Sequence, residues 1–124
     1  MAKILIVDDD PCIRRLLEQS LEELVDEGVE LVTADNGETA LGMIISENPD
    51  VVFLDVMMPK MNGFDVCSAA KSRQGSNDVF IVMLTVKGQK VDRQRGIDVG
   101  ADIYMTKPFN PDEILRVARN ILGI

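Results

Sequence analysis

VVFLD, residues 51–55, is a continuous run of apolar and β-branched residues that ends on a single carboxylate, Asp55. An unbroken apolar run of this length is typical of a central strand in a parallel sheet whose two faces are both covered by helices. The segment that follows, VMMPKMNG, residues 56–63, contains a proline and a glycine and is typical of a loop. An acid at the end of so apolar a strand indicates a site at that edge of the sheet.

Four other short apolar runs surround this segment, and helical patterns lie between them. The predicted strands are residues 3–7, 29–34, 51–55, 78–85 and 101–106. The predicted helices are residues 11–27, 35–45 (a turn entering a helix), 63–73, 88–99 and 111–121. Strand and helix alternate five times, which predicts one α/β domain over residues 1–124. We expect a flavodoxin-like, doubly wound (βα)5 three-layer sandwich with a parallel sheet in the order 2-1-3-4-5.

Composition excludes several classes of function. The 124 residues carry a formal net charge of −8, which disfavours contact with nucleic acid or an anionic membrane, so we expect neither as a direct partner. The absence of histidine removes Ser-His-Asp and Cys-His catalysis. Cys12 and Cys67 belong to helices on opposite faces of the predicted sheet, which excludes a disulfide. No apolar stretch reaches the length of a membrane span and no signal peptide is evident, so we expect a cytoplasmic protein.

Acidic residues end the first and third predicted strands. Asp8 and Asp9 follow residues 3–7, and Asp55 closes residues 51–55. In the predicted order the winding reverses between these two strands, and ligands bind beyond the carboxyl ends of strands at such a point. Three carboxylates in one crevice repel one another, and Mg²⁺ would relieve the repulsion while keeping open positions for phosphate oxygens. The cluster therefore suits phosphoryl chemistry with a carboxylate nucleophile.

Polar groups also end the fourth and fifth predicted strands. Thr85 supplies a hydroxyl and Lys107 an ammonium ion. In isolation the first is an ordinary strand residue and the second a surface charge, but beside the acids both suit the oxygens of a group attached to Asp55. The Lys107–Pro108 bond is a candidate for a cis peptide, because X-Pro bonds adopt cis at low cost. Asp10 and Asn110 each precede a proline and are predicted helix N-caps.

Four stretches in order, ILIVDDDP, FLDVMMPKMNG, MLT and GADIYMTKPF, resemble the receiver domain of bacterial two-component response regulators over essentially the whole chain. The resemblance implies that Asp55 is the phosphoacceptor and that Asp8, Asp9, Asp55 and the main-chain carbonyl of Met57 hold Mg²⁺. By the same resemblance Lys107 is the conserved lysine, Thr85 is the switch hydroxyl and Tyr104 is the aromatic whose rotamer follows phosphorylation.

The resemblance also implies a mode of action. A histidine kinase or a histidine phosphotransfer protein would donate the phosphoryl group in trans, since this chain has no histidine. Phosphorylation would then alter the surface formed by residues 88–99, 101–106 and 111–121, which would bind a downstream protein target. Catalysis would be limited to Mg²⁺-dependent self-phosphorylation and autodephosphorylation at Asp55.

Two alternatives remain open at this stage. One is a phosphatase that uses Asp55 as a transient nucleophile, although Met57 stands where a second general acid would be expected. The other is a receiver-like binding module that is never phosphorylated. Val86 gives that alternative slight support, because it is branched where the family usually has a small residue after the switch threonine.

Overall fold

The computed structural model describes residues 2–72, 79–86 and 97–124. The strands are β1 (Lys3–Val7), β2 (Glu30–Ala34), β3 (Val51–Asp55), β4 (Phe80–Val86) and β5 (Ile103–Lys107). The helices in the described part of the chain are α1 (Pro11–Ser20), α2 (Glu22–Asp26), α3 (Gly37–Glu47), α4 (Gly63–Ser72) and α6 (Pro111–Leu122).

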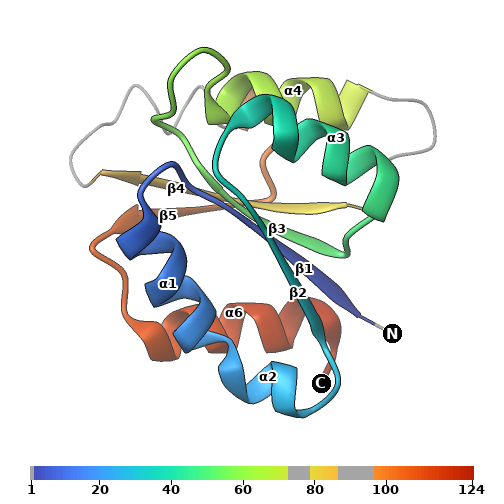
Figure 1. Cartoon of the computed structure of the whole chain (residues 1–124), viewed down its shortest axis with the longest axis vertical. Helices are drawn as coiled ribbons and strands as arrows, with labels where there is room; N and C mark the ends of the chain where they lie inside the picture. Colours follow the sequence, from blue (N-terminus) through green and yellow to red (C-terminus); the bar gives the residue numbers. More distant parts are fainter. Residues whose placement is uncertain (1, 73–78, 87–96) are drawn as a thin grey trace.

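The five strands form one parallel sheet in the order β2-β1-β3-β4-β5, which confirms the predicted topology. Figure 1 shows the sheet between two helical layers, with α3 and α4 on one face and α1, α2 and α6 on the other. Cys12 on α1 and Cys67 on α4 therefore lie on opposite faces, and both are free thiols. No helix in the described ranges is long and apolar enough to span a membrane.

Strand β3 lies at the centre of the core and is buried along its whole length. Alternate side chains of a strand point to opposite faces. Val52 and Leu54 accordingly pack in the core beneath α3 and α4. Val51 and Phe53 pack on the other face, beneath α1, α2 and α6. Coverage of both faces explains why this strand carries an unbroken apolar sequence.

The structure differs from the helix predicted over residues 11–27. The helix expected over 11–27 is divided at Leu21, which has a φ of −105° and a ψ of 4°. The Ser20 hydroxyl donates to the Leu16 carbonyl, a contact that competes with the helical ladder and bends helices. The sequence concealed this break because the buried Leu17, Leu21 and Leu24 keep one helical spacing across it. Most of the helix expected over 88–99 lies within residues 87–96, which are outside the described residues.

The predicted N-caps are confirmed. The Asp10 carboxylate accepts a hydrogen bond from the Cys12 main-chain N–H, and the Asn110 side chain accepts one from the Asp112 N–H. Each contact satisfies a donor that the first turn of a helix leaves without an intrahelical partner. The Lys107–Pro108 peptide is cis, as expected.

Gly63 sits where the loop after β3 enters α4, against the main chain of the strand it has just left. A Cβ at this position would overlap the main-chain oxygen of Asp55 and lie 2.9 Å from the Cα of Val56. The Gly63 N–H also donates to the Val56 carbonyl at 3.0 Å. Glycine therefore permits a close approach of two main chains that fixes the position of the Asp55 backbone.

We expect Gly63→Ala to destabilise the protein by roughly 1–3 kcal/mol, because the added methyl group must displace the main chain at Asp55. Gly42→Ala is the matched control. Gly42 lies inside α3, and a Cβ there meets nothing within 4 Å. That change should stabilise the protein by about 0.5–1 kcal/mol through helix propensity. Urea unfolding measures both, and equal effects would contradict the packing argument at Gly63.

Candidate functional site

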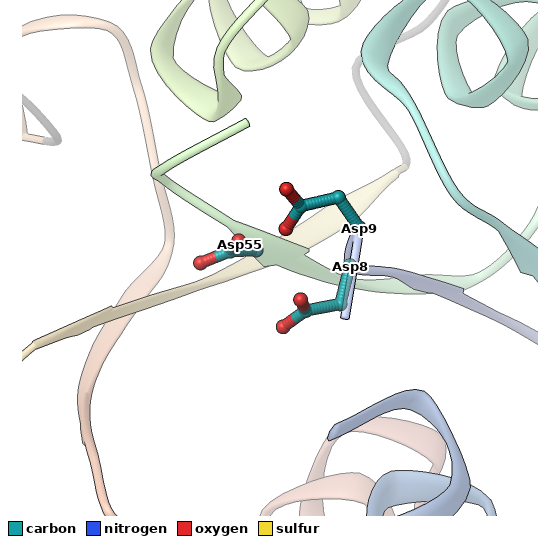
Figure 2. Close-up of side chains that lie close together, drawn as sticks. All are labelled: Asp8, Asp9 and Asp55. Atoms are coloured by element: carbon teal, nitrogen blue, oxygen red, sulfur yellow. The ribbon is translucent and has the colours of Figure 1, made fainter. Parts of the chain in front are cut away.

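The carboxylates predicted from the sequence meet at one end of the sheet. Asp8 follows β1 and Asp55 ends β3, and these strands are neighbours with Val7 opposite Leu54. One carboxylate oxygen from each of Asp8, Asp9 and Asp55 lies within 4.8 Å of the others. Figure 2 shows these three side chains close together. Asp8 and Asp55 are buried and Asp9 is exposed. Parallel strands end at the same edge, which explains why residues 47 positions apart converge.

Lys107 at the end of β5 is the cation of the cluster. Its Nζ donates to Asp8 Oδ2 at 2.8 Å and to Asp55 Oδ1 at 2.9 Å. Burial alone would lower the pKa of this ammonium, but hydrogen bonds to the two carboxylates outweigh burial and raise it. Lys107 is therefore charged, and it balances part of the negative charge of the acids.

Asp55 carries a perturbed carboxyl group. Burial raises its pKa from 3.8 to about 6, and the hydrogen bond from Lys107 opposes this rise. The charge of Asp8 raises the pKa further, whereas a hydrogen bond from the Met57 main chain lowers it. Despite the hydrogen bond from Lys107, the ionised form of Asp55 is less favourable in the folded state than in the unfolded chain.

Thr85, in β4 next to β3, adds a hydroxyl to the same end of the sheet. It is 1% exposed, and its Oγ1 has no hydrogen-bond partner within the described ranges. A buried hydroxyl without a partner costs stability, and such groups mark positions where a ligand atom binds. In the sheet, Thr85 lies opposite Thr106 of β5, and the residue before it, Leu84, lies opposite Asp55 of β3. An oxygen-bearing group on Asp55 would supply the partner.

The donor atoms of this site fit Mg²⁺. The three carboxylates offer hard oxygen ligands, and one of them is open to solvent, as expected for an ion that keeps several waters. With Lys107 as the one cation bonded to them within the described ranges, three carboxylates leave an excess of negative charge that a divalent ion would balance. The donor set thus supports the predicted ion type, and the use of the Met57 carbonyl as a ligand stays a prediction.

Other predicted residues are placed less decisively. The Met57 side chain is 59% exposed, whereas Met58 in the same loop is buried and Met61 packs against the core. Tyr104 is half-buried on β5 and packs against the core beneath α3 and α4. Its switch role stays a prediction.

Sequence reasoning missed Arg14. Its Nη1 donates to the main-chain carbonyl of Asp8 at 2.7 Å, from one turn inside α1. The Asp10 N–H donates to Asp8 Oδ1 at 2.9 Å, which gives Asp10 a second contact beyond its N-cap. No motif marked Arg14, because an arginine beside a second arginine on a helix is typical of a solvated face.

Comparison with known proteins agrees with this geometry, since residues 4–119 match the response regulator receiver domain family. The chain belongs to this family. The BeF3-activated receiver domain of DrrB from Thermotoga maritima superposes with a TM-score of 0.86 at 32% identity, covering 100% of this chain and 99% of that one.

Curated relatives of this receiver domain are longer proteins. The "probable transcriptional regulator ycf27" of Porphyra purpurea is 46% identical over 120 residues, which are 97% of this chain and 47% of that protein. The DNA-binding dual master transcriptional regulator RpaA of Synechocystis is 38% identical over 122 residues, 98% of this chain and 49% of that protein. The chain thus spans about half the length of these relatives.

These relatives correct one expectation. We expected no direct contact with nucleic acid, and that expectation is wrong for the group of proteins to which this receiver is similar, since RpaA is named as DNA-binding. The physical reason is that the net charge of a domain does not describe the charge of any one surface. A net charge of −8 describes 124 residues, and electrostatic repulsion from nucleic acid is a property of the surface that faces it.

We expect Asp55→Asn to stabilise the metal-free receiver by roughly 1–3 kcal/mol near neutral pH, because it removes a buried charge that folding disfavours. The folded-state pKa of Asp55 lies above its unfolded value, so the wild type loses stability as pH rises from about 4 to about 6, and the advantage of the variant grows over that range. Urea unfolding with a chelator across this range measures the difference.

Asp26→Asn is the matched control, because Asp26 is exposed on α2 and the change in net charge is the same. We expect it to change stability by less than about 0.5 kcal/mol at any pH. A loss of stability in Asp55→Asn near neutral pH would contradict the account of the crowded carboxylates.

Proposed function

We propose that this receiver domain accepts a phosphoryl group on Asp55 from a phosphohistidine of another protein. One observation carries the proposal: the buried Asp55 carboxylate lies beside Asp8 and Asp9, bonded to Lys107 and near a hydroxyl of Thr85 that lacks a partner in the described part of the chain. No histidine lies within residues 1–124, so the proposed donor histidine lies outside them, which is consistent with a histidine kinase or histidine phosphotransfer protein as partner.

In the proposed step an Asp55 carboxylate oxygen attacks phosphorus and forms an acyl phosphate. The bond between phosphorus and the donor's imidazole nitrogen breaks, and its electron pair stays on that nitrogen. Bound by Asp8, Asp9, Asp55 and the Met57 carbonyl, Mg²⁺ would neutralise the acids and orient the phosphoryl oxygens. Hydrolysis of the acyl phosphate returns the carboxylate, so the catalysis of this chain is confined to its own Asp55.

The response to phosphorylation follows from the contacts of the unmodified state. Lys107 bonds two carboxylates, and phosphorylation would convert one of them into an acyl phosphate with new charged oxygens. The Lys107 ammonium would donate hydrogen bonds to these new oxygens, and the Thr85 hydroxyl would donate one as well. Both residues belong to the strands β4 and β5, which would carry the change to a surface that includes β5 and α6. The third expected part of that surface, residues 88–99, lies mostly outside the described residues.

We infer a cytoplasmic protein, because that location is consistent with membership of the response regulator receiver family. We also infer that transcription is the output of the protein that carries this receiver, since two of its relatives are transcriptional regulators. The coding sequence on either side of residues 1–124 checks the second inference, which fails if it specifies a different output.

We expect incubation with Mg²⁺ and acetyl phosphate to add the mass of one phosphoryl group, because the buried, cation-bound carboxylate is a competent nucleophile for an acyl phosphate. Intact-protein mass spectrometry measures the gain, and a chelator should abolish it. Asp55→Asn is the control and should show no gain.

Other outcomes would favour other functions. Rapid, repeated phosphate release from small phosphate esters without a stable gain in mass would favour a phosphatase. Absence of both gain and release in the folded protein would favour a module that is never phosphorylated. A full gain in Asp55→Asn would contradict the assignment of the phosphoacceptor.

A further inference from the structure

The loop that joins β1 to α1 carries two of the three carboxylates and is closed by three hydrogen bonds. Asp8 Oδ1 accepts from the Asp10 N–H at 2.9 Å, and Asp10 Oδ1 accepts from the Cys12 N–H at 2.8 Å. The third bond, from Arg14 Nη1 to the Asp8 carbonyl at 2.7 Å, joins the start of the loop to the second turn of α1. Arg14 thus ties together the two ends of the segment that presents Asp8 and Asp9.

Arg14 and Lys107 contact Asp8 in different ways. Lys107 bonds carboxylate oxygens, which are the atoms that a cation would need. The Arg14 bond goes to the main chain, and no ion pair between Arg14 and a carboxylate is found in the described part of the chain. Arg14 therefore contacts the main chain of Asp8 and does not occupy the carboxylate oxygens of that residue.

We propose that Arg14 is a positioning residue for Mg²⁺: by holding the Asp8 carbonyl, it keeps the carboxylates of Asp8 and Asp9 turned toward Asp55. The inference rests on the proposed function, because it assumes that these acids bind the ion. A group that orients a metal ligand through a hydrogen bond typically contributes roughly 10–100-fold to metal affinity.

Charge and positioning predict opposite effects when Arg14 is replaced. A guanidinium bonded to the main chain of Asp8 places a positive charge close to the proposed ion site and repels Mg²⁺, so loss of the charge alone should tighten binding slightly. Loss of the bond to Asp8 should weaken binding, because the carboxylates must then be ordered when the ion binds. Since Arg14 is half-buried and its bond is charge-assisted, we expect the loss of positioning to dominate.

Arg15 provides the matched control. It is the next residue on α1, is exposed, and lines the same surface groove between α1 and β2 as Arg14. The Asp8 carbonyl accepts a hydrogen bond from Arg14, and no such bond from Arg15 is found in the described part of the chain. Arg14→Met and Arg15→Met remove the same charge from the same helix and retain an unbranched apolar stem.

The experiment measures the Mg²⁺ dissociation constant of each variant by calorimetric titration, with the melting temperature in chelator as a separate readout. We expect Arg14→Met to weaken Mg²⁺ binding about tenfold and Arg15→Met to leave it within about twofold of wild type or slightly tighter. Arg14→Lys, which retains a charged donor, should recover part of the affinity. At saturating Mg²⁺ the rate of phosphorylation by acetyl phosphate in Arg14→Met should approach that of wild type.

Equal Mg²⁺ affinities for Arg14→Met and Arg15→Met would overturn the inference. So would a lower melting temperature of Arg14→Met in chelator with an unchanged dissociation constant, because that pattern means a structural role alone. If Arg14→Met does not fold, Arg14→Lys takes its place, and an affinity equal to wild type together with an altered melting temperature would likewise mean a structural role alone. Wild-type protein that takes up no Mg²⁺ would instead refute the proposed function, and this inference with it.

Discussion

In the described part of the chain, three carboxylates and one ammonium ion meet at the carboxyl ends of β1, β3 and β5, and two of the carboxylates are buried. Like charges at this distance disfavour ionisation, and burial adds to the cost. Burial of the Asp55 carboxyl outweighs the hydrogen bond from Lys107, and the charge of Asp8 adds to the effect of burial, which is why the pKa of Asp55 remains raised. A site left with excess negative charge will bind a cation or a proton, and it suits a reaction in which both a divalent ion and a phosphoryl group can enter.

The fold is what sustains so unfavourable an arrangement. β3 is buried on both faces, so the apolar packing that stabilises the sheet surrounds the strand that ends on Asp55. At its end the chain turns away through a loop whose return is fixed by the close contact of Gly63 with the Asp55 main chain. A functional group can be held in a strained electrostatic environment when rigid elements on several sides fix its main chain.

Two kinds of cationic contact act on Asp8 and have different effects. The Lys107 ammonium bonds the carboxylate and lowers the cost of its charge, whereas the Arg14 guanidinium bonds the carbonyl and orders the main chain. A lysine suits the first task because its compact charge could move to a new partner in the proposed phosphorylated state. Arginine suits the second, because its planar, permanently charged group makes directional bonds from a distance.

Sequence alone determined the strand positions to within two residues, the sheet order, the helix caps at Asp10 and Asn110, and the identity of the acids, because apolar periodicity and capping depend on neighbouring residues. It could not locate the division at Leu21, the exposure of Met57 or the bond from Arg14 to Asp8, since each depends on packing between segments. It also indicated that Asp55, Thr85 and Lys107 end adjacent strands. Only the tertiary structure decided that the lysine bonds two carboxylates while the buried hydroxyl is left without a partner in the described part of the chain, because hydrogen bonds between distant side chains require the distances and angles of the folded chain.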